Sequence, residues 1–191
     1  MIQPWDHLHE EVFGSFKVFD LKRVRRRSPR TGREHDFFVI HTRDWVNVLP
    51  FTPDGRLVMV RQFRHGPARF TLELPGGIFD PGEDPGAAAA RELREETGHG
   101  FRELRYVGQV NPNPALFTNT CYTFLALGCE RIGELQQDAG EDIEVVTVSE
   151  AEADRLAMAG EVDHALVLAA FYWQRLLREG RLMPRPGPPQ R

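Results

Sequence analysis

The chain has 191 residues, of which 41% are hydrophobic and 27% are charged, so it is long enough for one full domain with a sizeable core. Its formal net charge of −4 argues against a general nucleic-acid binder and against a protein of the membrane surface. There is no apolar run of membrane-spanning length, no apolar signal region at the start and only 2 cysteines, so we expect a cytoplasmic protein with reduced thiols.

The first elements in chain order form a predicted β-hairpin over residues 12–42. Two β-rich runs, 12–27 and 35–42, flank a turn at 28–32 that contains proline and glycine. Arginines crowd this turn: Arg23, Arg25, Arg26, Arg27, Arg30 and Arg33. We interpret the cluster as a solvated hairpin tip, and a phosphate-binding patch is the alternative.

A second predicted hairpin pairs residues 45–51 with 57–63 around a Pro-Asp-Gly turn. A further strand over 70–75 then leads into Gly76 and Gly77. Because glycine has no side chain, the backbone at these two positions can approach a ligand closely.

The most informative pattern of the chain lies between residue 87 and Gly98. Residues 87–96, AAAARELREE, are strong helix formers, and Gly98 stands where a glycine commonly ends a helix. Glu92 and Glu96 lie one turn apart on such a helix, with Glu95 beside them, so three like charges need a counter-charge. Mg²⁺ and Mn²⁺ prefer oxygen ligands of this kind, and the pattern therefore indicates a metal site that binds phosphates. An ordinary solvated, charged helix is the alternative.

The rest of the chain predicts strands and helices in irregular alternation. The strands are expected over 104–110, 121–128 and 142–149. Ser149 and Glu152 form a capping box for a short helix, and Asp163 is placed to cap a longer helix over 164–180. The proline-rich tail, residues 183–191, is expected to be disordered.

The spacing of charged and glycine residues around the central helix matches a known motif. Five residues separate Gly77 from Glu83, and seven more precede the run RELREETG, which ends at Gly98. This pattern resembles the signature of the Nudix hydrolases, which cleave nucleoside diphosphates linked to another moiety. One position departs from it, because His99 stands where an aliphatic residue usually follows. We expect His99 to change local packing and to leave the metal ligands intact.

The resemblance implies an α/β fold, an α/β/α sandwich with a mixed sheet, preceded by an N-terminal antiparallel hairpin sheet. It covers nearly the whole chain. We therefore expect one Nudix hydrolase domain over residues 1–182, with a hairpin extension over 1–43 and the core over 44–182.

Four segments outside the motif resemble one subgroup, the ADP-ribose and nucleotide-sugar pyrophosphatases. They are VRQFRHG (60–66), LELPGG (72–77), NPNPALFTN (111–119) and GEDIEVV (140–146). This implies hydrolysis of a nucleoside diphosphate linked to a sugar, of ADP-ribose or GDP-mannose type, to a nucleoside monophosphate and a sugar phosphate. It also implies a homodimer whose subunits complete each other's pockets. The loop over 113–117 departs from the usual ADP-ribose pattern, so the base and the sugar stay open.

Two alternatives stay open. One belongs to another class, a non-catalytic Nudix module that senses a nucleotide, and the other is still an enzyme, a hydrolase of another nucleoside diphosphate derivative. The complete set of glutamates on the helix favours hydrolysis, because a binding module has no chemical need for all of them.

The resemblance implies the ligands of the metal ion. Glu92 and Glu96 correspond to the principal ligands of Mg²⁺ or Mn²⁺, and the Gly76 carbonyl to a backbone ligand. Glu95 corresponds to an additional ligand or to a group that orients water, so Glu95 and Glu96 both belong to the catalytic set.

A general base must lie within hydrogen-bond reach of the attacking water, and subgroup members take it from a loop far downstream. Glu141 is the candidate, with Asp142 and Glu144 as alternatives. Glu83 and Arg91 are interpreted as structural, because Arg91 can reach back and fix the preceding loop against the helix.

Four residues are candidates for substrate binding: Arg61, Arg64, Glu73 and Phe117. The two arginines suit a diphosphate, or alternatively an ion pair with Glu73. Phe117 suits stacking on a base, although core packing is the more common role of a phenylalanine. Three histidines have no metal-ligand spacing and are expected to be satisfied by ordinary contacts: His65, His99 and His164.

Overall fold

The computed structural model describes residues 2–136, 142–184 and 187–188. The chain forms two compact units, one made of residues 1–44 and 111–120 and the other of residues 45–110 and 121–191. None of the helices in these described ranges has both the length and the apolar character needed to cross a membrane.

The first unit is an antiparallel sheet with the strand order β1-β2-β3. Its strands are Asp6–Ser15 (β1), Asp20–Arg27 (β2) and Glu34–His41 (β3). The predicted hairpin sheet is confirmed, but the run over 12–27, expected as one strand, is broken into the end of β1, a turn and β2. The turn closes where the Phe16 N–H donates to the Phe19 carbonyl at 2.9 Å and the Ser15 hydroxyl donates to Asp20.

The second unit is built on a six-stranded mixed sheet with the order β11-β5-β4-β9-β8 and with β6 paired to β5. Its strands are Trp45–Phe51 (β4), Leu57–Arg64 (β5), Arg69–Glu73 (β6), Glu103–Val110 (β8), Cys121–Leu127 (β9) and Ile143–Val148 (β11). Strands β4 and β9 are parallel, and the other pairs are antiparallel. Two short strands, His99–Gly100 (β7) and Glu130–Arg131 (β10), form a separate antiparallel pair.

Strands β4 and β5 diverge after one registered pair, Phe51 with Leu57. Where they separate, the segment that follows β6 lies along β4. The Val48 N–H donates to the Pro75 carbonyl at 2.9 Å. This divergence opens the sheet next to Gly76 and Gly77, the residues that follow Pro75.

The first helix, α1 (Pro85–Thr97), carries the glutamates singled out in the sequence. It begins two residues before the predicted run, because the Asp84 side chain accepts hydrogen bonds from the N–H groups of Gly86 and Ala87. It ends as predicted at Gly98, which adopts a left-handed φ of 69°.

The other helices are α2 (Glu150–Met158) and α3 (Ala165–Arg178). Ser149 caps α2, as its sequence predicts. The predicted cap of α3 is wrong. His164 occupies the N-cap position and makes no side-chain capping bond, whereas Asp163 forms an ion pair with Arg69.

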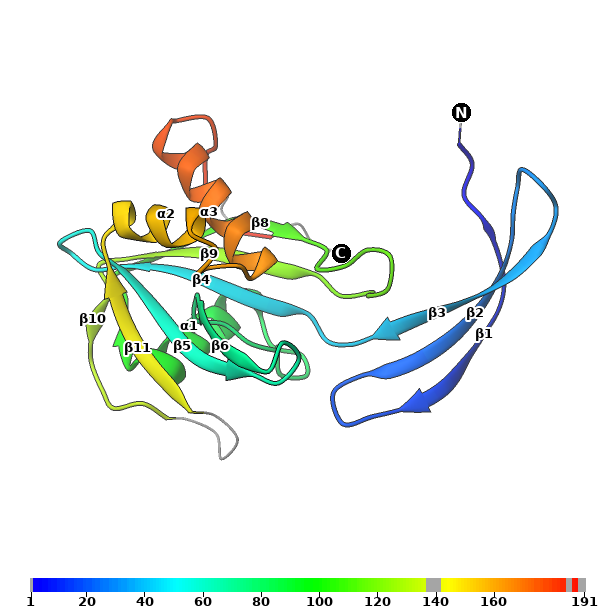
Figure 1. Cartoon of the computed structure of the whole chain (residues 1–191), viewed down its shortest axis with the longest axis horizontal. Helices are drawn as coiled ribbons and strands as arrows, with labels where there is room; N and C mark the ends of the chain where they lie inside the picture. The colour runs from blue at the N-terminus through cyan, green and yellow to red at the C-terminus, as the bar shows by residue number, and fades with distance from the viewer. Residues whose placement is uncertain (1, 137–141, 185–186, 189–191) are drawn as a thin grey trace. The chain divides into compact units, whose positions relative to one another are not determined.

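Within the second unit, α1 covers one face of the sheet and α2 and α3 cover the other (Figure 1). The cluster on the α2 and α3 side includes Leu49, Leu57, Met59, Leu156, Val167 and Phe171. The cluster on the α1 side includes Val46, Val48, Ala88, Leu93, Tyr122 and Phe124. Burying one large apolar side chain contributes about 1.5–3 kcal/mol, so these two layers fix the position of α1 on the sheet. The predicted α/β sandwich is confirmed.

Candidate functional site

The glycine-rich loop contains Gly76 and Gly77 and connects β6 to α1 in the sequence. In space it packs between β4 and α1. The Val46 N–H donates to the Gly77 carbonyl at 2.9 Å, which fixes the loop on β4. A Cβ atom on Gly76 would overlap the Val46 carbonyl, and one on Gly77 would overlap the Glu92 carboxylate. Glycine at both positions therefore allows the backbone to fit between a strand and a charged side chain.

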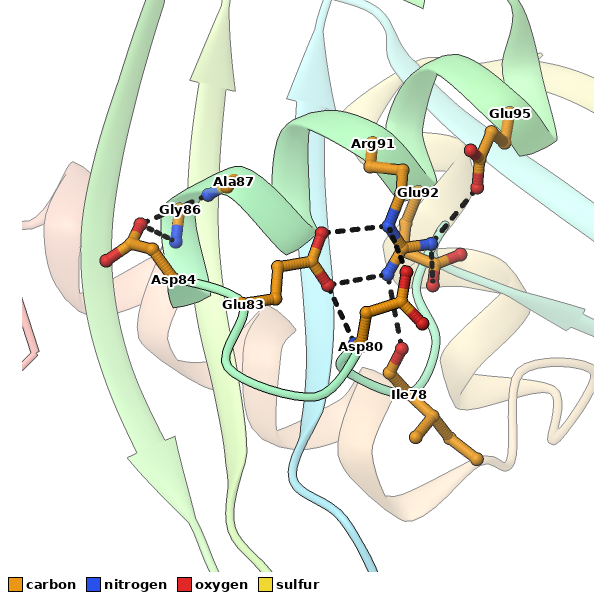
Figure 2. A network of polar contacts seen from close by, with 9 residues as sticks. All are labelled: Ile78, Asp80, Glu83, Asp84, Gly86, Ala87, Arg91, Glu92 and Glu95. Atoms are coloured by element: carbon orange, nitrogen blue, oxygen red, sulfur yellow. Dashed lines mark hydrogen bonds and ion pairs between the residues drawn. The ribbon is translucent and has the colours of Figure 1, made fainter. Parts of the chain in front are cut away.

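Arg91 is the centre of the polar network on this side of the sheet, as Figure 2 shows. Its Nε and Nη2 atoms donate to the two oxygens of Glu83, both at 2.9 Å. Its Nη1 atom donates to Glu92 at 2.9 Å and to Glu95 at 3.0 Å. The Nη2 atom also reaches the Ile78 carbonyl at 3.2 Å. One guanidinium thus joins the loop to the helix and offsets the repulsion among the carboxylates.

The charges in this network stabilise one another. Hydrogen bonds from Arg91 hold the pKa of Glu83 below its usual range. The hydrogen bond with Glu83 is also the largest cause that raises the pKa of Arg91, and Glu92 and Glu95 add to it. The Asp80 N–H donates to Glu83 at 2.9 Å, which closes the loop. The pair therefore acts as a brace between loop and helix, the role expected from the sequence.

Glu96 and Glu92 are the buried carboxylates of the site. Glu96 is 4% exposed and accepts a hydrogen bond from the Gly76 N–H at 2.8 Å, and Glu92 is 9% exposed. Carboxylates taken out of water need compensating charge or hydrogen bonds. A cation beside Gly76 would meet this need.

The donor set fits a hard divalent cation by its chemistry, because it consists of carboxylates beside a peptide backbone. In the described part of the chain, no three His, Cys, Asp or Glu side chains are already arranged as metal ligands. Arg91 bonds Glu92 and Glu95, and the Gly76 N–H bonds Glu96. Each of these bonds uses one oxygen of a carboxylate that has two.

A second charge pair, between the buried Glu73 and the partly exposed Arg64, lies on the hairpin of β5 and β6. Arg64 donates through Nε and Nη2 to the two oxygens of Glu73 at 2.8 and 2.9 Å, and the Thr71 hydroxyl donates at 2.6 Å. Burial acts to raise the pKa of Glu73, but the hydrogen bonds from Arg64 and Thr71 outweigh it and lower the pKa. The His164 Nε2 atom lies 3.9 Å from the same carboxylate.

The remaining predicted residues lie elsewhere. Arg61 points to the opposite face of β5 from Arg64 and donates to Glu144 on β11 at 3.1 Å. Phe117 belongs to the first unit, where it forms an isolated bridge with Ile40. Glu141, the candidate base, lies outside the described residues, and its neighbour Asp142 is exposed.

A cavity of about 600 Å³ adjoins the glycine-rich loop within the second unit. Asn47 Nδ2 and His164 Nδ1 are buried polar atoms of residues that line it, and neither has a hydrogen-bond partner among the described residues. The expectation that His164 is satisfied by ordinary contacts is therefore wrong. Asn47 was missed, although a polar residue inside the apolar run WVNVLPF was a signal.

Comparisons with known proteins bear on the family and the fold of this chain. The model of the NUDIX domain matches residues 41–171. The ADP-ribose pyrophosphatase of Bacillus subtilis (strain 168) is 31% identical over 168 residues, 87% of this chain and 90% of the relative. The ADP-ribose pyrophosphatase of Mycobacterium tuberculosis (strain ATCC 25618 / H37Rv) is 28% identical over 184 residues, 95% of this chain and 88% of the relative. The crystal structure of an ADP compounds hydrolase superposes with a TM-score of 0.83 at 24% identity, covering 95% of this chain and 99% of that one.

Proposed function

The chain belongs to the Nudix family of hydrolases, and we propose that it cleaves the pyrophosphate bond of a nucleoside diphosphate linked to a sugar. The products are a nucleoside monophosphate and a sugar phosphate. ADP-ribose is the first candidate, since two relatives that match most of the chain are ADP-ribose pyrophosphatases, and a GDP-mannose type compound is the second.

One observation carries this proposal: the glutamates of α1 surround Arg91 and face the loop at Gly76 and Gly77. Hydrolases of this family generally use divalent metal ions. We assign Glu92, Glu95, Glu96 and the Gly76 carbonyl as ligands of Mg²⁺ or Mn²⁺. When bound, such an ion neutralises phosphate oxygens and lowers the pKa of its bound water.

The residues of the chain orient and activate the reactants around that ion. Arg91 fixes Glu92 and Glu95 on one side of the helix and keeps the loop in place. Glu96 holds the ion as a principal ligand, Glu95 adds a further ligand or orients the attacking water, and Glu141 accepts the proton of that water. Glu144 is less suited to this step, because Arg61 already bonds its carboxylate.

We propose that Arg61, Arg64, Glu73 and Phe117 contact the substrate. Arg64 is the best supported of them, since it lines the cavity next to Gly76 and Gly77. Glu73 then acts by orienting the Arg64 guanidinium through a bidentate pair. Phe117 would stack on the base.

A homodimer is part of the same proposal. The sheet of the first unit exposes large apolar side chains, among them Val12 (58%), Phe13 (60%), Phe16 (57%) and Phe38 (46%). Exposed apolar residues grouped on one small sheet commonly mark a protein interface. A single monomer mass in light scattering at micromolar concentration would contradict the dimer.

Product release tests the reaction directly. The panel consists of ADP-ribose, GDP-mannose, UDP-glucose, ADP-glucose, diadenosine polyphosphates and nucleoside triphosphates, each with Mg²⁺, with Mn²⁺ and with a chelator. We expect one diphosphate-sugar to be cleaved, and both Glu96→Gln and the chelator to abolish cleavage. Turnover of triphosphates alone would overturn the substrate class. Binding of a nucleotide without turnover of any compound would favour the sensing module.

A further inference from the structure

We propose that the cavity beside Gly76 and Gly77 binds the sugar of the substrate, and that Asn47 and His164 select it by hydrogen bonds to its hydroxyl groups. This inference rests on the proposed function, because it names the part of that substrate which enters a second subsite. It assigns a role to Asn47 and His164, which have no part in the proposed metal site on α1.

Asn47 lines this cavity and is a polar residue inside an apolar strand. The residue is 9% exposed, and its Nδ2 atom has no hydrogen-bond partner in the described part of the chain. Its neighbours on β4, Val46 and Val48, are buried and apolar. A buried donor without a partner is unfavourable, and such groups are rare in folded proteins. A ligand that accepts a hydrogen bond from Nδ2 would remove this cost.

His164 supplies a complementary atom at the start of α3. It occupies the N-cap position, yet its side chain makes no capping bond, and its buried Nδ1 atom has no partner among the described residues. Its other nitrogen, Nε2, faces the Glu73 carboxylate at 3.9 Å. In the neutral tautomer that carries the proton on Nε2, Nδ1 is an acceptor. Asn47 and His164 therefore offer one donor and one acceptor, which suits hydroxyl groups because each hydroxyl both accepts and donates.

The charges around the cavity favour a neutral group over a phosphate. Arg64 is paired with Glu73, and Arg69 is paired with Asp163. All four side chains line the cavity, so two positive and two negative charges cancel there. Eight of the eighteen lining residues are polar or charged, and the lining contains a single aromatic ring of the Phe, Tyr or Trp type, from Trp45. This composition fits a hydroxylated ring better than a nucleobase.

The position of the cavity connects it to the reaction. Gly76 and Gly77 line it, and the same glycines contact the carboxylates of α1. A diphosphate held beside those carboxylates by the proposed cation would therefore place one of its two attached groups, the sugar or the nucleoside, at the entrance of the cavity. A site built to hydrogen-bond a hydroxyl discriminates strongly against a compound that lacks it, so this pocket would set the sugar preference.

Calorimetric binding of the two product halves tests the proposal without requiring turnover. The ligands are ribose 5-phosphate, mannose 1-phosphate, AMP, GMP and inorganic phosphate, each titrated into the full chain. The variants are Asn47→Leu and His164→Ala. The control is Thr123→Val, because Thr123 is a buried residue that pairs with Asn47 across β4 and β9 and is not among the described residues that line the cavity.

We expect wild type to bind one sugar phosphate more tightly than inorganic phosphate. Each variant should weaken that binding by about fivefold or more, the equivalent of one hydrogen bond, and should leave AMP and GMP unchanged. The melting temperature of Asn47→Leu should stay equal or rise, because an unsatisfied buried amide is replaced by an apolar group of similar size. Thr123→Val should bind every ligand as wild type does.

Three results would overturn the proposal. The first is that no sugar phosphate binds wild type better than inorganic phosphate. The second is that both variants bind sugar phosphates normally. The third is that nucleotide binding weakens instead, which would make this the pocket of the base. If the substrate panel shows no turnover while both variants still lose sugar-phosphate binding, the proposed reaction fails and the sugar pocket stands.

Discussion

Arg91 bonds both oxygens of Glu83 with two different nitrogens of its guanidinium, each contact measuring 2.9 Å. Seven residues lie between the two in the sequence, and the two side chains belong to α1 and to the loop before it. The Arg91 side chain is 22% exposed and that of Glu83 is 14% exposed, so the pair is better shielded from water than a surface ion pair. Fixing the loop in this way also fixes Gly76 and Gly77.

Replacing Arg91 by lysine should destabilise the protein although the charge is kept. A lysine ammonium cannot reproduce a planar fork that bonds two oxygens of Glu83, so we expect a loss of about 2 kcal/mol in the free energy of unfolding. Urea denaturation measures it. Arg94→Lys is the matched control, because Arg94 lies exposed on the same helix and should change little. Equal stability of the two variants would contradict the bracing role.

Alanine at the two loop glycines should produce different defects. A Cβ on Gly76 meets the backbone carbonyl of Val46, which cannot move without breaking β4, so Gly76→Ala should lower the melting temperature markedly. A Cβ on Gly77 meets the end of the Glu92 side chain, so Gly77→Ala should displace that carboxylate and reduce turnover with a smaller loss of stability. Thermal denaturation and kcat for each variant test this contrast. Equal losses of melting temperature and of kcat in the two variants would contradict this difference.

The sequence predicted the α1 region well because its signals are local. The alanine-rich run, Gly98 and the spacing of the glutamates all act within a few residues of one another. The start of α1 was placed late, because the Asp84 side chain caps the helix across Pro85 and Gly86. Helix ends depend on such single hydrogen bonds and shift by one or two residues.

The partners of Arg61 and Arg64 could not be assigned from the sequence. Alternation along β5 sends these two side chains to opposite faces, and the register with the neighbouring strands decides which carboxylate each one meets. The pairing of β5 with β6 gives Glu73 to Arg64, and the pairing with β11 gives Glu144 to Arg61. Asn47 was missed for a related reason, since only the divergence of β4 and β5 makes its side chain line a cavity.

Glu73 should contribute stability that is lost in acid. Arg64 and Thr71 hold the pKa of this buried carboxyl below 4.5, its usual value, although burial opposes them. The folded protein therefore binds fewer protons than the unfolded chain, and the contribution is complete above about pH 4.5 and disappears as the pH falls through the lowered pKa. We expect the stability difference between wild type and Glu73→Gln to shrink as the pH falls below that value. Urea unfolding from pH 6 to pH 3 measures it, and a constant difference would contradict the pairing.

Both cysteines should be unreactive in the native protein. Cys121 and Cys129 are buried and form no disulfide, and burial raises the pKa of the Cys129 thiol to about 12. The thiolate is the reactive form, so a disulfide reagent such as DTNB should modify neither thiol in the native protein and both in urea. Rapid modification without denaturant would show that this part of the core opens readily.

The identity of the general base is the most direct test of the mechanism. Glu141→Gln should reduce kcat by about 100-fold or more, since general-base catalysis typically contributes at least that factor. Affinity for Mn²⁺, measured by calorimetry, should stay as in wild type, because the proposed ligands lie on α1 and at Gly76. Glu144→Gln is the matched control from the same segment: the Glu144 carboxylate is already bonded to Arg61 on the neighbouring strand, so this variant should lose far less activity. Wild-type turnover in Glu141→Gln would remove Glu141 from the mechanism, and a large loss in Glu144→Gln alone would transfer the role to Glu144.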